Sequence, residues 1–236
     1  MPIVLSPSAG RIAAFAAHPD DVEAWCAGTL ALAVDAGAEV RLLLVTSGDK
    51  GSADPDADPA TVAATREAEA TEAGRRLGLA EVAFLRRPDG DVEPDRALRA
   101  DLVRWLRRWR PDVLFTHDPE RPLPPYLAHR DHRAVGRAAL DAVYPLARDP
   151  LAFPEHRAEG LAPHAVAAAW LFASAGADTH VDIAGGFDRK VAARLAHASQ
   201  TPDPAALPAA WRDRHAAIGA PVGLALAEAF TVLTLG

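Results

Sequence analysis

The sequence has none of the features that stabilise secreted proteins or anchor a chain in a membrane. Cys26 is the only cysteine among 236 residues, so an internal disulfide is excluded. No segment approaches the roughly 18 consecutive apolar residues of a membrane helix. The first residues, MPIVLSPSAG, lack the charged start and the long apolar run of a secretory signal. We therefore expect a cytoplasmic protein with no membrane partner.

Lysine is also scarce, because Lys50 and Lys190 are the only two and arginine supplies nearly all of the positive charge. The chain has 25 basic and 32 acidic residues, which gives a net charge of −7. A negative charge opposes binding to phosphate backbones, and the sequence offers no basic stripe. We expect no nucleic-acid partner.

Short apolar runs alternate with segments of helical periodicity, which is typical of βα units around a mainly parallel sheet. Half of the residues are hydrophobic, enough for one full core, so we expect a single α/β domain over residues 1–236. The patterns predict strands at 12–16, 40–46, 82–85, 113–116, 166–173 and 180–183. They predict helices at 22–36, 61–77, 95–110, 133–146 and 187–197. The alanine-rich, proline-broken segment 202–221 predicts no element.

Four loops follow predicted strands and carry most of the polar residues of interest. They are residues 18–21, 47–51, 87–90 and 117–132. Because the carboxyl ends of parallel strands meet at one edge of a sheet, and ligands bind there, we expect these loops to lie together.

Two of these loops are dense in histidine and aspartate. The first contains AHPDDVE, in which His18 and Asp21 are three residues apart, so that one turn can direct both at one point. The second contains HRDH at 129–132, and His132 can supply a third ligand from a neighbouring strand end. Two histidines and one carboxylate leave coordination positions free for water and substrate, as a catalytic metal site requires.

Asp20 is next to Asp21 but must point elsewhere, which suits a base that takes a proton from a metal-bound water. The alternative interpretation is that Asp20 or Asp21 caps the helix at 22–36, that Asp131 caps the next one, and that the histidines are incidental. Two such loops at corresponding strand ends favour the metal site.

The motifs AHPDDVE and HRDH resemble the AHPDDxE and HxDH signatures of the LmbE/PIG-L-like zinc deacetylases, which include N-acetylglucosaminyl deacetylases of mycothiol and bacillithiol synthesis. The resemblance covers most of the chain. It continues through SGDKG at 47–51, REAE at 66–69, PDG at 88–90, THDP at 116–119, VDI at 181–183 and HASQ at 197–200.

The resemblance implies a role for each residue of the two motifs. His18, Asp21 and His132 would bind zinc, and Asp20 would be the general base. His129 would act as an acid or stabilise the oxyanion. Asp131 would orient a histidine from behind the metal ligands.

The resemblance also implies a Rossmann-like, three-layer fold without a dinucleotide. The sequence agrees, because no G-x-G-x-x-G follows the first predicted strand. Two positions depart from the family pattern, namely Arg130, where proline is frequent, and Ala198, where arginine is familiar. Both bear on substrate contacts and leave the metal ligands intact.

Further residues are candidates for substrate contacts. Arg66 faces the substrate in the resembling family, although with Glu69 it could equally form a surface ion pair. Asp89 suits sugar hydroxyls, although a Pro-Asp-Gly turn also explains it. Lys50 is a weak candidate in a glycine-flanked loop. His197 matches the family's His-x-Ser-Gln motif and is expected at the rim of the site.

The remaining histidines, at 156, 164, 180 and 215, are expected to be non-catalytic, and Cys26 to be packed rather than ligating.

Together these residues predict a zinc-dependent hydrolase that releases acetate from a small N-acyl substrate, most simply an N-acetylglucosamine conjugate. A non-sugar amide also fits, as does Fe²⁺ in place of zinc. The same ligands match the facial triad of non-haem iron oxygenases, and a third alternative is a metal-binding protein without catalysis. Asp20 and His129 favour the hydrolase. A homo-oligomer is compatible with the resemblance.

Overall fold

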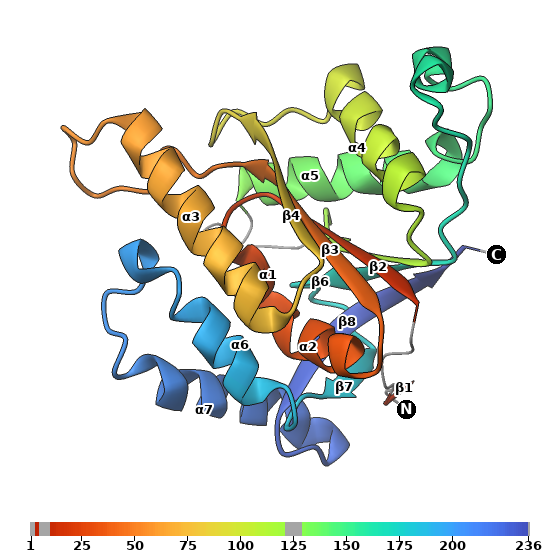
Figure 1. Cartoon of the computed structure of the whole chain (residues 1–236). Coiled ribbons are helices and arrows are strands. Elements are labelled where there is room, and N and C mark those ends of the chain that lie inside the picture. The colour runs from red at the N-terminus through yellow and green to blue at the C-terminus, as the bar shows by residue number, and fades with distance from the viewer. Residues whose placement is uncertain (1–2, 5–9, 121–128, 236) are drawn as a thin grey trace.

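The computed structural model describes residues 3–4, 10–120 and 129–235 and consists of one β-sheet covered by helices on both faces (Figure 1). The strands of the sheet are β1 (Ile3–Val4), β2 (Arg11–Ala16), β3 (Glu39–Thr46), β4 (Glu81–Arg87), β5 (Val113–His117), β6 (Ala168–Phe172), β7 (Thr179–Asp182) and β8 (Ala227–Thr234). Their order is β1-β7-β8-β6-β5-β2-β3-β4. Only β8 runs antiparallel to its neighbours among these strands, so the predicted mainly parallel α/β sheet is confirmed.

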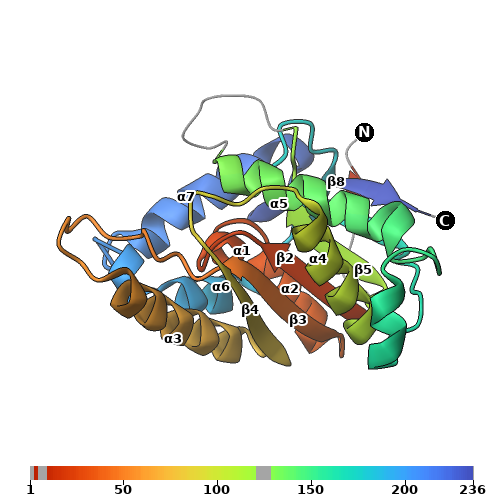
Figure 2. The same cartoon turned by 90° about the horizontal axis from the view of Figure 1, so that it is seen from above.

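The helices are α1 (Asp21–Trp25), α2 (Ala27–Asp35), α3 (Pro59–Leu77), α4 (Arg96–Trp109), α5 (Arg130–Asp141), α6 (Phe187–Arg194) and α7 (Leu207–Gly219). Short helical turns lie at Ala142–Leu146, Pro154–Glu159, Ala198–Gln200 and Ala220–Val222. Figures 1 and 2 show α4 and α5 on one face of the sheet and α1, α2, α3 and α6 on the other. No helix in the described part of the chain is long and apolar enough to span a membrane.

The central strand β2 shows why the sheet is buried on both faces. Ala13 and Phe15 pack into the core on the α4 and α5 side, while Ile12, Ala14 and Ala16 pack into the core on the other side. Side chains alternate along a strand, so a continuous apolar run fills both layers.

Local signals set the ends of α3, which begins at Pro59 rather than at the predicted Thr61 and ends at Leu77 as predicted. Asp58 caps its first turn by accepting hydrogen bonds from the backbone N–H groups of Ala60 and Thr61, and Gly78 ends it in a left-handed conformation.

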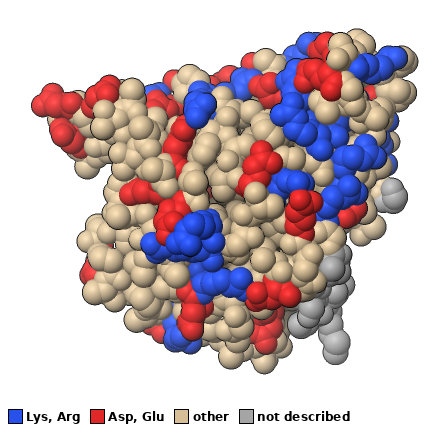
Figure 3. All heavy atoms as spheres, viewed as in Figure 1, with Lys and Arg blue, Asp and Glu red and all other residues tan. Residues whose placement is uncertain are grey.

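In Figure 3 basic side chains gather over the region of α4, whose arginines pair with nearby acidic residues such as Asp101, the partner of Arg104.

The predicted helix at 22–36 is wrong in one respect, because it is two helices with a break at Cys26. Glu228, from β8, accepts hydrogen bonds from the backbone N–H groups of Gly28 (2.9 Å) and Thr29 (2.8 Å). This carboxylate caps the start of α2, and it comes from 200 residues away in the sequence.

Other boundaries also differ from the predictions. The helix predicted at 133–146 starts at Arg130, and its α-helical part ends at Asp141, before a wider turn that contains Pro145. The helix predicted at 187–197 ends at Arg194. The unassigned segment 202–221 contains α7, and neither β1 nor β8 was predicted.

Candidate metal centre and active site

The candidate site lies at the carboxyl ends of the adjacent parallel strands β5, β2, β3 and β4. His18 and Asp21 follow β2, and Asp89 follows β4. His132 lies in the first turn of α5, which His129 precedes as its N-terminal cap. The expectation that these loops meet at one edge of the sheet is therefore confirmed for the described residues. Positions 121–128 of the predicted loop 117–132 lie outside them.

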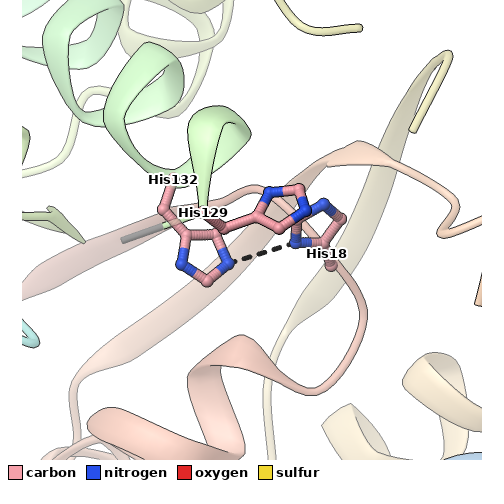
Figure 4. Close-up of side chains that lie close together, drawn as sticks. All are labelled: His18, His129 and His132. Atoms are coloured by element: carbon pink, nitrogen blue, oxygen red, sulfur yellow. Dashed lines mark hydrogen bonds between the residues drawn. The ribbon is translucent and has the colours of Figure 1, made fainter. Parts of the chain in front are cut away.

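The three predicted metal ligands converge on one point. Nδ1 of His18 lies 3.2 Å from Nε2 of His132 (Figure 4). Oxygen atoms of Asp21 lie 3.0 Å from Nε2 of His132 and 3.5 Å from Nδ1 of His18. Donor atoms bound at about 2.0–2.2 Å to one tetrahedral zinc ion lie about 3.3–3.6 Å apart. The nitrogen and oxygen atoms of this set therefore fit such an ion with little movement.

The other nitrogen of His18 faces two more carboxylates. Nε2 lies 3.0 Å from Oδ1 of Asp89 and 3.3 Å from Oδ2 of Asp131. Asp131 is completely buried, and it accepts hydrogen bonds from the backbone N–H groups of Gly90 (2.7 Å) and Val92 (3.3 Å). This places Asp131 where a carboxylate fixes the orientation of a histidine ring.

Three buried carboxylates thus surround His18. Burial alone would lower the pKa of His18, but its hydrogen bonds to Asp131, Asp21 and Asp89 raise it to about 12. The Asp21 carboxyl is buried, which would raise its pKa, yet His132 and His117 hold that pKa well below its usual range. Three carboxylates around one histidine give the cluster an excess of negative charge, which a bound divalent cation would reduce.

His117, which the sequence analysis did not single out, is part of this cluster. It is the last residue of β5 and is buried, with Nε2 3.2 Å from Oδ2 of Asp21 and its ring stacked on that of His132. The same Nε2 accepts a hydrogen bond from the backbone N–H of Ala17 at 3.1 Å. Its place at a strand end, in the THDP segment, was the signal available from the sequence.

His129 lies beside the converging ligands but is exposed. Its ring centre is 4.7 Å from that of His18 and 5.3 Å from that of His132 (Figure 4). Its Nδ1 accepts a hydrogen bond from the backbone N–H of Asp131 at 3.2 Å. Partial loss of hydration lowers the pKa of His129, and the neighbouring His18 and His132 lower that pKa further.

The Asp20 carboxylate lies near the guanidinium groups of Arg66 and Arg194, and the residue has a left-handed backbone conformation with φ of 90°. Burial, followed by the negative charge of Asp21, raises the pKa of Asp20 to about 6, against the opposing effect of Arg66 and Arg194. A carboxyl group with a pKa near neutrality can both accept and return a proton at physiological pH.

Two candidate substrate contacts have partners that the sequence did not reveal. Arg66 is 5% exposed, so the surface ion pair with Glu69 is wrong. Its guanidinium donates hydrogen bonds to the carbonyl groups of Gly48 and Pro19. Asp89 is buried, with its carboxylate on His18 rather than free in a turn. Their contacts with substrate stay predictions.

The remaining candidates are placed as follows. Lys50 is exposed and donates a hydrogen bond to Asp91 at 2.9 Å. His197 does not reach the rim of the site, because it is fully buried with its Nε2 3.4 Å from the Glu23 carboxylate. Cys26 is buried among core residues and has a free thiol.

Comparisons with known proteins point to deacetylases. A family model described as PIG-L, GlcNAc-PI de-N-acetylase, matches residues 13–143. The chain is 30% identical over 186 residues to the diacetylchitobiose deacetylase of Thermococcus kodakarensis, covering 79% of this chain and 68% of that protein. It is 36% identical to the 1D-myo-inositol 2-acetamido-2-deoxy-alpha-D-glucopyranoside deacetylase of Nakamurella multipartita, covering 60% of this chain and 57% of that protein.

The fold is similar to that of a solved deacetylase. The N,N'-diacetylchitobiose deacetylase from Pyrococcus horikoshii superimposes with a TM-score of 0.88 at 28% identity, over 96% of this chain and 84% of that one. The matched regions are a little over two thirds of the Thermococcus protein and little more than half of the Nakamurella protein.

Proposed function

Because this chain belongs to the PIG-L family of GlcNAc-PI de-N-acetylases, we propose that it hydrolyses the acetamide of a small N-acetylglucosamine-type substrate with the help of a bound metal ion. The observation that carries the proposal is the convergence of His18, Asp21 and His132, whose donor atoms lie 3.0–3.5 Å from one another. The deacetylases among the relatives act, by their names, on acetylated amino sugars.

We propose zinc as the metal, held by Nδ1 of His18, the Asp21 carboxylate and Nε2 of His132. Zinc takes nitrogen and oxygen donors in this arrangement, and three protein ligands leave a position for water. When bound, the ion lowers the pKa of that water toward about 7 and polarises the acetyl carbonyl. Asp131 and Asp89 hold the far side of His18 and fix its ring.

The residues around the metal carry the proton transfers. Asp20 accepts the proton of the attacking water as its oxygen bonds to the acetyl carbon. His129 donates a hydrogen bond to the oxyanion that forms. The carbon–nitrogen bond then breaks, the proton passes from Asp20 to the departing nitrogen, and the products are acetate and a free amine.

Acetate release tests the proposal directly. The zinc-loaded protein is incubated with N-acetylglucosamine, N,N'-diacetylchitobiose, an N-acetylglucosaminyl inositol and a non-sugar acetamide. We expect acetate and primary amine in equal amounts from at least one of the sugars. Absence of acetate from all of them, together with metal-dependent oxygen uptake, would favour the iron oxygenase instead.

A further inference from the structure

Two arginines converge on Asp20 from two helices on the same face of the sheet. Nη2 of Arg66, on α3, lies 3.6 Å from Oδ1 of Asp20. Nη2 of Arg194, the last residue of α6, lies 3.8 Å from Oδ2. Each oxygen of the carboxylate therefore has its own guanidinium group.

Arg194 is held in this place by groups of the turn that follows α6. Its Nη1 donates hydrogen bonds to Oγ1 of Thr201 (2.5 Å) and to the carbonyl of His197 (3.4 Å), and its Nη2 donates to the carbonyl of Gln200 (2.8 Å). The side chain is 13% exposed. A planar guanidinium bound at several fixed acceptors has little freedom to move.

Arg66 is also held in place by hydrogen bonds to backbone carbonyl groups. It donates to the carbonyl groups of Gly48 (3.1 Å) and Pro19 (2.8 Å). A side chain at Gly48 or Gly51 would collide with it, because a Cβ atom there would lie 2.1 Å or 2.2 Å from Nη1 of Arg66. The loop at 47–51 closes around this guanidinium because both residues are glycine.

Neither arginine donates a hydrogen bond to the Asp20 carboxylate. Distances of 3.6 and 3.8 Å exceed those of hydrogen bonds, so the attraction is one of charge alone. Across residues 10–120 and 129–235, no group donates a hydrogen bond to this carboxylate. Each oxygen thus faces a positive charge that is itself held in place, and both oxygens are still free to accept a proton.

We infer that Arg194 is a positioning residue for Asp20. Together with Arg66, it places the Asp20 carboxylate between two positive charges. This keeps the carboxylate in the orientation that receives the proton of the attacking water. The inference rests on the proposed function and adds to it a residue that the motifs do not contain. Arg194 acts through Asp20, whose Oδ2 it faces.

Kinetics of three variants test the inference. Arg194→Met should lower kcat at least about 10-fold, since misdirecting a catalytic group costs rate, and should leave KM and metal content unchanged. Arg194→Lys should recover part of the loss, because it keeps the charge. Arg189→Met is the matched control, since Arg189 is on the same helix but pairs with Asp35, and it should keep wild-type kcat.

The same substitution in an Asp20→Asn background separates positioning from a structural effect. Once Asp20 no longer acts as a base, Arg194→Met should cause no further loss of kcat. An equal loss in both backgrounds, or loss of metal from Arg194→Met, would overturn the inference.

A crystal structure of Arg194→Met gives a readout that does not depend on activity. We expect the Asp20 carboxylate to turn away while His18, Asp21 and His132 stay in place, and an unmoved carboxylate would contradict the inference. A wild-type protein that releases no acetate would instead count against the proposed function, so the two failures are distinguishable.

Discussion

Nδ1 of His18 lies 3.2 Å from Nε2 of His132, although 114 residues separate them in the chain. The turn after β2 positions the first, and the first turn of α5 positions the second. Asp21 completes the set and also accepts a hydrogen bond from the backbone N–H of His18 at 2.8 Å, which fixes the turn between them.

The neighbouring aspartates Asp20 and Asp21 should differ in their effects when replaced. Asp21→Ala removes a metal ligand, so both metal content and turnover should fall. Asp20→Asn keeps the size of the side chain but cannot accept a proton, so metal should remain while kcat falls by roughly 10²–10⁴-fold. Elemental analysis and acetate release on both purified variants make the comparison. Near-wild-type turnover of metal-loaded Asp20→Asn would eliminate Asp20 as the base.

Metal removal should destabilise the fold as well as abolish activity, because it leaves the carboxylates around His18 without a divalent counter-charge. Zinc added to the metal-free protein at about 100 times its Kd should raise the free energy of unfolding by about 2.7 kcal/mol. Thermal denaturation with and without zinc measures this. Asp21→Ala is the control and should show a much smaller zinc-dependent shift, whereas an unchanged wild-type Tm would count against a metal at this position.

Arg107 should contribute strongly to stability although it has no role in the site. It is buried on α4 and donates hydrogen bonds to five backbone carbonyl groups, those of Leu146, Ala147, Asp149, Ala152 and Phe153. Arg107→Met leaves these acceptors without their donor and should lower the free energy of unfolding by about 3 kcal/mol.

The adjacent Arg108 serves as the control for Arg107. It is exposed and lies over the ring of Trp105, so Arg108→Met should cost less than about 1 kcal/mol. Urea denaturation of both variants gives the two values. If Arg107→Met lowered the free energy of unfolding no more than Arg108→Met does, water would be replacing Arg107 as the donor to these carbonyl groups.

His215 should make the protein less stable in mild acid. Burial, together with the charge of Lys190, lowers the pKa of His215 from 6.5 to about 4 in the folded protein. The unfolded chain therefore binds a proton below pH 6.5 that the folded protein does not bind until about pH 4. The contribution of the neutral ring is complete above pH 6.5 and is lost as the pH falls toward 4.

His215→Asn removes this titration and keeps a donor at the position of Nδ1, which contacts the carbonyl of Ala227 at 2.9 Å. Between pH 6 and 5, the unfolding free energy of the wild type should fall by about 1 kcal/mol more than that of the variant. Urea denaturation at both pH values measures the difference. Equal slopes would show that His215 takes up its proton in the folded state as well.

The motifs and the local patterns of the sequence were sufficient to predict the family and the class of fold. The resemblance based on AHPDDVE and HRDH is confirmed by the family match. Continuous apolar runs predicted the central parallel strands. Asp58 and Gly78 are the residues that cap the two ends of α3. These features depend on residues within a few positions of one another, where periodicity and capping act.

The tertiary structure alone decided which distant groups complete these elements. Glu228 divides the first predicted helix, His117 joins Asp21 and His132, and Arg194 reaches Asp20 from α6. It also buried His197, which the motif had suggested for the rim of the site. Contacts between residues 100 or more positions apart depend on the order of strands in the sheet and on which helix faces they bring together. Local periodicity carries no information about either, because a helix or strand shows the same pattern whichever neighbour covers it.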